Sequence, residues 1–151
     1  MSVKVVSTNR KARHDYYLTD TYEAGIVLQG SEIKSIRAGQ ISIKEAYVQI
    51  EDQEAWLINA HIAPYEQASY LGHEPRRKRK LLLHRREIDR LWDAVRKKGL
   101  TIIPTRVYLT NGRAKIEIAV GRGKKQYDKR LEIAKRDAQR EMDRNLRRKD
   151  Y

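Results

Sequence analysis

The dipeptide Asn111-Gly112 constrains the fold more than any other feature, because it separates two runs that alternate apolar and polar residues. Asn-Gly tolerates the positive φ angles of a tight type I′ turn, which joins two antiparallel strands. The flanking runs are TRVYLT, after Pro104, and AKIEIAV, which ends before Gly121. We therefore predict a β-hairpin that closes the folded body.

Two earlier stretches also have the character of strands. The run from Asp15 to Leu28 is rich in aromatic, Thr and β-branched residues, which predicts one long strand bent near Gly25. A second hairpin is predicted around the polar turn EDQE, because apolar residues alternate with their neighbours on both sides of it. The apolar residues of this alternation are Ala46, Val48, Ile50, Trp56, Ile58, Ala60 and Ile62.

Two helices are expected in the body. Gly30 and Gly39 bracket the short segment SEIKSIRA, which has Glu32 in its first turn, where the helix dipole favours an anion. From about residue 84, apolar residues recur at the spacing of a single helix face, and Gly99 provides a left-handed stop. The apolar residues of that face are Ile88, Leu91, Trp92 and Val95.

These elements predict a mainly β protein with short helices, arranged as a partly open β-barrel of the OB type. The body is expected to span residues 1–120, with a flexible arm at about 1–8 and a surface loop at residues 64–75. Residues 121–151 form a basic tail whose apolar stripe is too thin to commit it to a core. We expect this tail to be disordered when free and helical when bound to RNA.

The charge of the chain points to a polyanionic partner. Its 33 Lys and Arg against 20 Asp and Glu give a formal net charge of +13. No segment approaches the roughly 20 apolar residues that span a bilayer, so no membrane contact is expected. The absence of Cys excludes disulfides and thiolate metal sites and suits the cytoplasm. Nucleic acid is therefore the expected partner.

Basic residues at the edges of elements and in loops are the candidates for phosphate contacts. We expect several of these loops to meet at one mouth of the barrel and to form one continuous surface. For the run RRKRK at 76–80, phosphate binding and simple solvation both remain open. The candidates are Arg10, Lys11, Arg13, Lys34, Arg37, Arg77, Lys78, Lys80, Lys124 and Lys125.

Nothing in the sequence assembles a catalytic or cofactor site. The four His residues lack paired ligand spacing, and the segment GRGKK lacks most of the P-loop pattern. The one tight acidic group, Glu51, Asp52 and Glu54, falls in a predicted turn. We therefore predict no catalytic residue, no metal and no cofactor. An RNA adaptor and a structural ribosomal or other OB-fold rRNA-binding protein both remain open.

Four segments together resemble small protein B, the SsrA-binding protein family of bacterial trans-translation. They are NRKARHDY at 9–16, YEAGIVLQGSEIKSIRAG at 22–39, RKRKLLLHRREI at 77–88 and GRGKKQYDKR at 121–130. The resemblance implies a barrel that binds the tRNA-like domain of transfer-messenger RNA (tmRNA) and rescues stalled ribosomes. It implies no enzymatic activity, and we expect the protein to act as a monomer.

The resemblance also assigns residues. It implies that Asn9, Glu23 and Leu82 bind tmRNA, with the basic residues above as support. It implies that the tail enters the ribosomal decoding centre and the vacant mRNA channel as a helix. Ser31 and Tyr127 depart from common family residues, Trp or Thr at the first position and His at the second. The decoding-centre residues would be Gly123, Lys124, Lys125, Tyr127, Asp128, Lys129 and Arg130.

Overall fold

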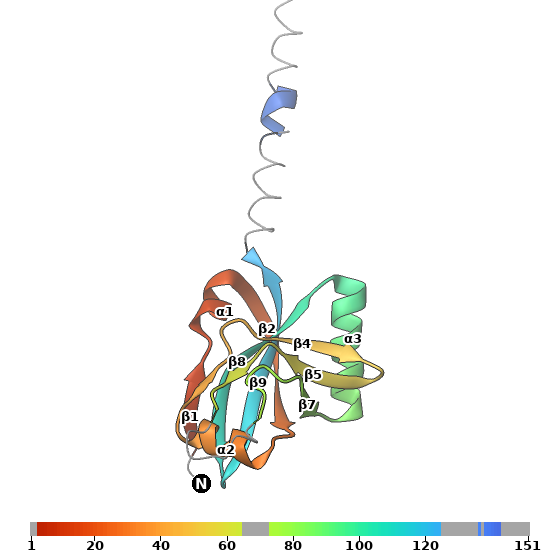
Figure 1. Ribbon diagram of the computed structural model, residues 1–151. Coiled ribbons are helices and arrows are strands. Elements are labelled where there is room, and N and C mark those ends of the chain that lie inside the picture. Colours follow the sequence, from red (N-terminus) through yellow and green to blue (C-terminus); the bar gives the residue numbers. More distant parts are fainter. Residues whose placement is uncertain (1–2, 65–72, 125–135, 137, 143–151) are drawn as a thin grey trace, which may run out of the picture.

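The computed structural model of the 151-residue chain describes residues 3–64, 73–124, 136 and 138–142 (Figure 1). Strands predominate, and three helices accompany them between residues 3 and 124 of the described chain. The elements are β1 (Val3–Thr8), α1 (Arg10–Asp15), β2 (Tyr16–Ile26), α2 (Gly30–Arg37), β3 (Ile41–Ser42), β4 (Tyr47–Glu51), β5 (Glu54–Ile58), β6 (His61–Ile62), β7 (Arg79–Leu82), α3 (Arg85–Lys98), β8 (Thr101–Thr110) and β9 (Arg113–Gly123).

The main sheet curls into a partly open barrel. Its strand order is β1-β8-β4-β5-β7-β2-β9, and β9 also pairs with β8, so the sheet returns on itself. Two of the junctions are narrow: β4 meets β8 only through Val48 and Ile102, and β2 meets β7 through Gly25 and Ile26. The mainly β, partly open barrel predicted from the sequence is confirmed.

The hairpin of β8 and β9 forms around the predicted turn. Asn111 and Gly112 have φ angles of 50° and 74°, as a type I′ turn requires, and Thr110 lies opposite Arg113. Ile116 and Ile118 of β9 are fully buried. β9 extends to Gly123, so the folded body continues beyond the predicted limit at residue 120.

The second hairpin forms with the predicted apolar phase in β4, where Val48 is buried, but the phase of β5 was predicted wrongly. Only Asp52 and Gln53 make the turn, both with positive φ, and Glu51 pairs with Glu54. The buried residues of β5 are consequently Ala55 and Leu57, whereas Trp56 and Ile58 lie on the outer side and are partly exposed. Asn59, at φ 65°, then interrupts the alternation, which brings Ala60 and Ile62 back into the core.

The prediction of a flexible arm at residues 1–8 was also wrong for the residues that the structure describes. Residues 3–8 form β1, which pairs antiparallel with β8, so that Val3 lies opposite Thr110. Because this partner is about a hundred residues away in the sequence, no local pattern announced the pairing.

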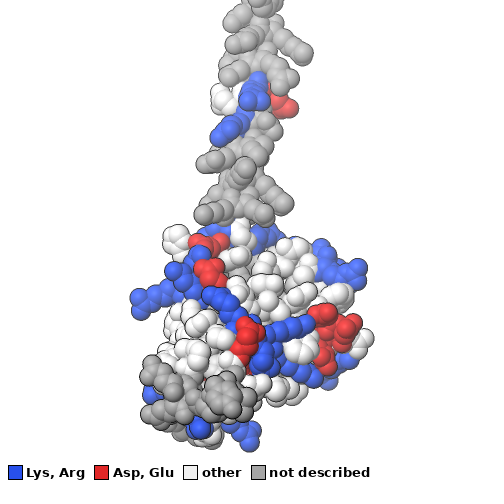
Figure 2. Space-filling view, in the orientation of Figure 1, with Lys and Arg blue, Asp and Glu red and all other residues white. Residues whose placement is uncertain are grey.

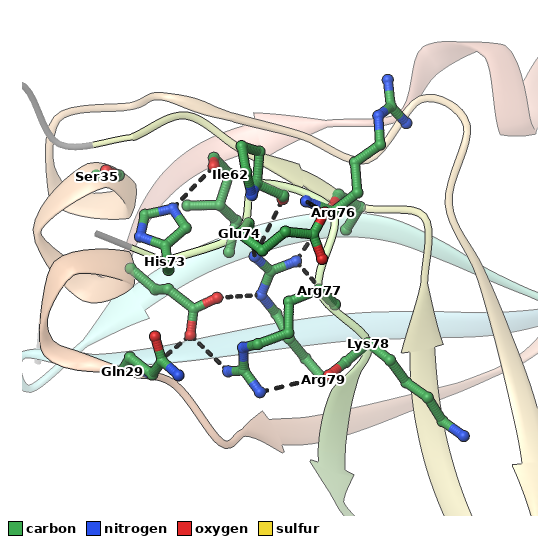
Figure 3. A network of polar contacts seen from close by, with 12 residues as sticks. Gln29, Ser35, Ile62, His73, Glu74, Arg76, Arg77, Lys78 and Arg79 are labelled. Atoms are coloured by element: carbon green, nitrogen blue, oxygen red, sulfur yellow. Dashed lines mark hydrogen bonds and ion pairs between the residues drawn. The ribbon is translucent and has the colours of Figure 1, made fainter. Parts of the chain in front are cut away.

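α2 is held to the barrel by a buried ion cluster of Glu32, Arg77 and Arg79 (Figure 3). The Glu32 carboxylate accepts bonds from Arg77 Nη2 and Arg79 Nε, each at 2.5 Å, and from the Gln29 N–H at 2.7 Å. Burial would raise the pKa of Glu32, but these hydrogen bonds outweigh it and hold the pKa below its ordinary value. The carboxylate therefore stays ionised within the fold.

Arg79 uses all five of its donors inside the protein. Besides Glu32, it donates to the carbonyl oxygens of Ala60, Arg77, Glu74 and Pro75 at 2.9–3.4 Å. Next to it, the buried His73 bonds through Nε2 to the Ile62 carbonyl and through Nδ1 to the Ser31 hydroxyl. The cluster joins α2 to the chain on both sides of residues 65–72. These residues make up most of the predicted surface loop at 64–75 and lie outside the described residues.

The predicted helix at 84–98 is confirmed as α3, with His84 before it and Gly99 at φ 64° after it. Of its predicted apolar face, only Leu91 is buried, while Trp92 and Val95 are exposed. In the predicted tail, Arg136 and residues 138–142 are helical and exposed. The rest of the tail prediction beyond Lys124 falls outside the described residues.

Candidate RNA-binding surface

A groove of about 540 Å³ lies where β2, β7 and the start of α3 meet. Glu23 of β2 and Leu82 of β7, the two exposed residues that the family resemblance singled out, both line it, and Lys80 joins them. Leu82 is 55% exposed, and the missing side chain at Gly25 leaves it room, since a Cβ there would lie 3.3 Å from the Leu82 Cβ. The remaining lining residues are Gly25, Gln53, Glu54, Leu81, Leu83, His84, Arg85, Glu87, Ile88 and Lys115.

The carboxylate of Glu23 is oriented by the neighbouring strands. It accepts a short hydrogen bond from the Tyr108 hydroxyl of β8, and burial together with this bond raises the pKa of Tyr108. Tyr108 therefore remains a protonated donor. Glu23 lies directly opposite Glu117 of β9, whose carboxylate is bound by Thr105 Oγ1 at 2.6 Å and paired with Arg106 at 3.4 Å. Each of the two adjacent carboxylates therefore has partners of its own: Tyr108 for Glu23, and Thr105 and Arg106 for Glu117.

The basic run at 76–80 is divided by the alternation of β7. Arg79 and Leu81 point into the protein and are buried, while Lys78 and Lys80 point outward. Lys80 pairs with Glu54 at 3.2 Å and Lys78 with Glu51 at 2.8 Å, and all four side chains are 41–50% exposed. Exposed pairs of this kind contribute about 0–1 kcal/mol, so phosphates can compete for the lysines.

Asn9 is not exposed: it is 3% accessible and caps α1. Its Oδ1 accepts from the Ala12 N–H, and its Nδ2 donates to the carbonyl oxygens of Ile43 and Pro104 at 3.2 and 3.0 Å. These bonds hold α1 against the barrel, and Arg10, Lys11 and Arg13 project from it into solvent. Asn9 therefore fixes α1, and with it these exposed cations, to the barrel.

The predicted cations do not meet at one mouth of the barrel, which corrects the single continuous surface expected from the sequence. Arg37 of α2 donates to the Gly112 carbonyl at the turn between β8 and β9, with Lys34 on the same helix. Lys124 follows the other end of β9 and donates to the Arg13 carbonyl at 3.2 Å. The eleven residues of β9 separate these ends by roughly 30 Å (Figure 1).

The base of the tail packs beside α1. Gly123 ends β9, and the Nζ of Lys124 lies 5.1 Å from the ring centroid of Tyr17, which is itself 45% exposed. The other predicted decoding-centre residues lie outside the described part of the chain: they are Lys125, Tyr127, Asp128, Lys129 and Arg130.

Lys and Arg side chains are spread over the face shown in Figure 2, and acidic side chains gather near the tip of the β4–β5 hairpin, which carries Glu51, Asp52 and Glu54. Among the described residues, no group of three or more His, Asp and Glu residues could hold a metal ion. No helix in this described part is long and apolar enough to cross a membrane.

Lys115 is a groove residue that the sequence reasoning missed. It lies on β9 two residues before Glu117, with Ile116 between them in the core, and it lines the groove beside Glu23. The alternation of AKIEIAV already placed Lys115 and Glu117 on one face, which was the available signal. The partner strand that completes the groove, β7, was not recognisable within the basic run.

The fold and the groove together define a small, basic β-barrel protein with a surface suited to a polyanion such as RNA. Residues 6–148 match the model of the SmpB protein family. The chain belongs to this family.

Individual relatives agree with that membership. The SsrA-binding protein of Roseiflexus castenholzii is 59% identical over 145 residues, which cover 95% of this chain and 92% of the relative. The SsrA-binding protein of Desulforudis audaxviator is 55% identical over 144 residues, covering 95% and 94% of the two chains. A solved structure described as "tmRNA-SmpB: a journey to the center of the bacterial ribosome" superposes with a TM-score of 0.67 at 49% identity, covering 80% of this chain and 85% of the other.

Proposed function

We propose that this protein binds the tRNA-like domain of tmRNA through its barrel and serves trans-translation on stalled ribosomes in the cytoplasm. The observation that carries the proposal is the groove in which Glu23, Leu82 and Lys80 come together. Its relatives are named SsrA-binding proteins, which supports the same ligand. The protein acts as a monomeric adaptor, without catalysis and without a cofactor.

Each groove residue has a distinct task in this proposal. The Glu23 carboxylate, held by Tyr108, accepts hydrogen bonds from a base or a 2′-hydroxyl, a group that distinguishes RNA from DNA. Leu82 packs against the apolar face of a ribose or base. Lys80 and Lys115, at the groove walls, neutralise phosphates on either side of that contact.

The cations outside the groove extend this contact at two places. Arg10, Lys11 and Arg13 lie on α1 beside the base of the tail, and Lys34 and Arg37 lie on α2 at the other end of the barrel. A folded RNA can touch separated patches of this kind, because its phosphates are spread over a large surface. Arg77 and Lys78 precede Arg79 and Lys80 in the basic run and complete the set, with Arg77 offering RNA the part of its side chain that stays exposed beside its bond to Glu32.

The tail is the ribosome-binding part of the proposal. Lys124 donates to the Arg13 carbonyl and so fixes where the chain leaves the barrel. From there, Gly123, Lys124, Lys125, Tyr127, Asp128, Lys129 and Arg130 contact the decoding centre, and the following residues form a helix in the empty mRNA channel.

The test is a chain truncated after Lys124, which keeps all of β9. We expect it to bind the tRNA-like domain with the dissociation constant of the full chain, measured by filter binding, and to support no tagging of stalled nascent chains in a reconstituted translation system. Loss of RNA affinity on truncation, or normal tagging without the tail, would contradict this division of labour.

A further inference from the structure

One side of α3 carries apolar side chains that remain partly exposed in the folded protein. Leu91 is fully buried, but Trp92 is 40% exposed and Val95 is 36% exposed. Tryptophan is enriched where one molecule binds another, because its large ring contributes much contact area. These exposed residues therefore mark a candidate contact surface.

This surface continues the groove. Arg85 and Ile88 line the groove at the start of α3, Trp92 follows Ile88 by four residues, and Arg96 follows Trp92 by four. Residues four apart are neighbours on one face of a helix. We call Arg85, Ile88, Trp92, Val95 and Arg96 the α3 stripe. In Figure 1, α3 stands beside the barrel and leads away from β7 toward the end where the tail begins.

The charge on α3 favours a polyanion as the occupant. The Arg96 guanidinium lies 5.0 Å from the Trp92 ring centroid and has no ion pair within the described residues. Arg85 pairs with Asp89 at 3.5 Å, with both side chains more than 60% exposed, so this pair exchanges readily for a phosphate. The helix carries six Arg and Lys against three Asp and Glu.

We propose that the α3 stripe extends the RNA interface, with Trp92 stacking on an unpaired base of the RNA in the groove and Arg96 binding the adjoining phosphate. Base stacking on an aromatic ring needs no particular sequence, and an arginine beside the ring strengthens the contact. The proposal rests on the proposed function, because it takes tmRNA as the ligand of the groove.

The experiment measures the affinity of the full chain for the tRNA-like domain of tmRNA. Trp92→Ala should weaken binding about five- to 150-fold, the effect of losing one stacked base, while Trp92→Phe should retain most of the affinity. Arg96→Gln should lower the slope of log affinity against log salt by about 0.7–0.9, the value for one phosphate. The matched control is Val3→Ala, because Val3 is 54% exposed but lies on β1, outside the stripe and the groove; it should bind like the parent.

A second readout follows Trp92 itself. The chain has two tryptophans, so in a Trp56→Phe protein the tryptophan fluorescence comes from Trp92 alone, and saturating RNA should quench it. Unchanged affinity of Trp92→Ala together with unquenched Trp92 emission would overturn the proposal. Unchanged affinity for free tmRNA with weakened ribosome association would also overturn it, because the partner would then be a ribosomal component.

The groove variants Glu23→Gln and Leu82→Ala separate the two proposals. If they weaken binding while Trp92→Ala does not, only the α3 extension fails. If neither they nor Trp92→Ala affects binding, the proposed function of the groove fails with it.

Discussion

Arg79 and Lys80 are neighbours in one basic run, yet the fold uses them in opposite ways. Arg79 is fully buried, with every donor bonded inside the protein, whereas Lys80 is 41% exposed at the wall of the groove and pairs loosely with Glu54. The strand geometry of β7 decides this, because successive side chains point to opposite faces. A run of positive charge is therefore not a single functional unit: one residue stabilises the fold, and the next is available to a ligand.

The largest effect is expected for Arg79→Ala. Removing the guanidinium leaves the Glu32 carboxylate buried with only part of its compensation, which costs about 3–5 kcal/mol of unfolding free energy. Urea denaturation measures it, and Lys80→Ala is the matched control, which should stay within about 0.5 kcal/mol of the parent. Equal stability of the two variants would show that the buried cluster does not hold α2 to the barrel.

Glu23→Gln should have the next largest effect, mainly on binding. The amide keeps an oxygen for the Tyr108 hydroxyl but loses the charge, and a hydrogen bond to a charged group is worth about 1.5–3 kcal/mol. We expect tmRNA affinity to fall at least about tenfold, with a smaller loss of unfolding free energy, because the amide oxygen still accepts the bond from Tyr108. A fall in stability of the same size would make Glu23 a structural residue like Arg79.

Glu32 should make the unfolding free energy of the protein sensitive to acid. Its pKa is lowered in the fold from the usual 4.5, so its contribution is complete above pH 4.5 and is lost as the pH falls through the folded-state pKa. Thermal unfolding from pH 6 to pH 3 should show the stability difference between the parent and Glu32→Gln as constant above pH 4.5 and shrinking below it. A difference that grows in acid would contradict the ion cluster.

The smallest effect is expected for Lys80→Ala on binding. One phosphate contact fewer should lower the slope of log affinity against log salt by about 0.7–0.9 and weaken binding modestly at low salt. Lys78→Ala serves as the comparison, because Lys78 lies two residues before Lys80 and does not line the groove; it should change the slope less. A larger change for Lys78 would move the contact off the groove.

Local signals predicted the parts of the fold that depend on local chemistry. Asn111-Gly112 located the β8–β9 turn and Gly99 located the end of α3, because positive φ is required at both places. The pairing of β1 with β8 depends on a partner far along the chain. Which face of the sheet Trp56 occupies depends on the length of the turn before it, which takes up only two of the four polar residues EDQE. Neither could be read from a short window.

The residues of the candidate site also differ in whether the sequence alone could assign them. Glu23 and Leu82 were assigned by family resemblance, and their convergence in one groove depends on the pairing of β2 with β7. The burial of Arg79 was hidden because a charged run looks solvated until its buried partner, Glu32, is brought next to it from α2. The resemblance also assigned Asn9 to RNA, which stays a prediction; no sequence pattern indicated the bonds that its side chain makes to α1 and the barrel.

The most direct test of the groove uses the absence of cysteine from the chain. A single Leu82→Cys substitution, at a side chain that is 55% exposed, can carry an iron chelate that cleaves RNA nearby. We predict strong cleavage confined to the tRNA-like domain of tmRNA, and little from the same probe at Val3→Cys on β1, where the side chain is 54% exposed. Absence of cleavage from position 82 in a complex that still forms, or equal cleavage from position 3, would contradict the account.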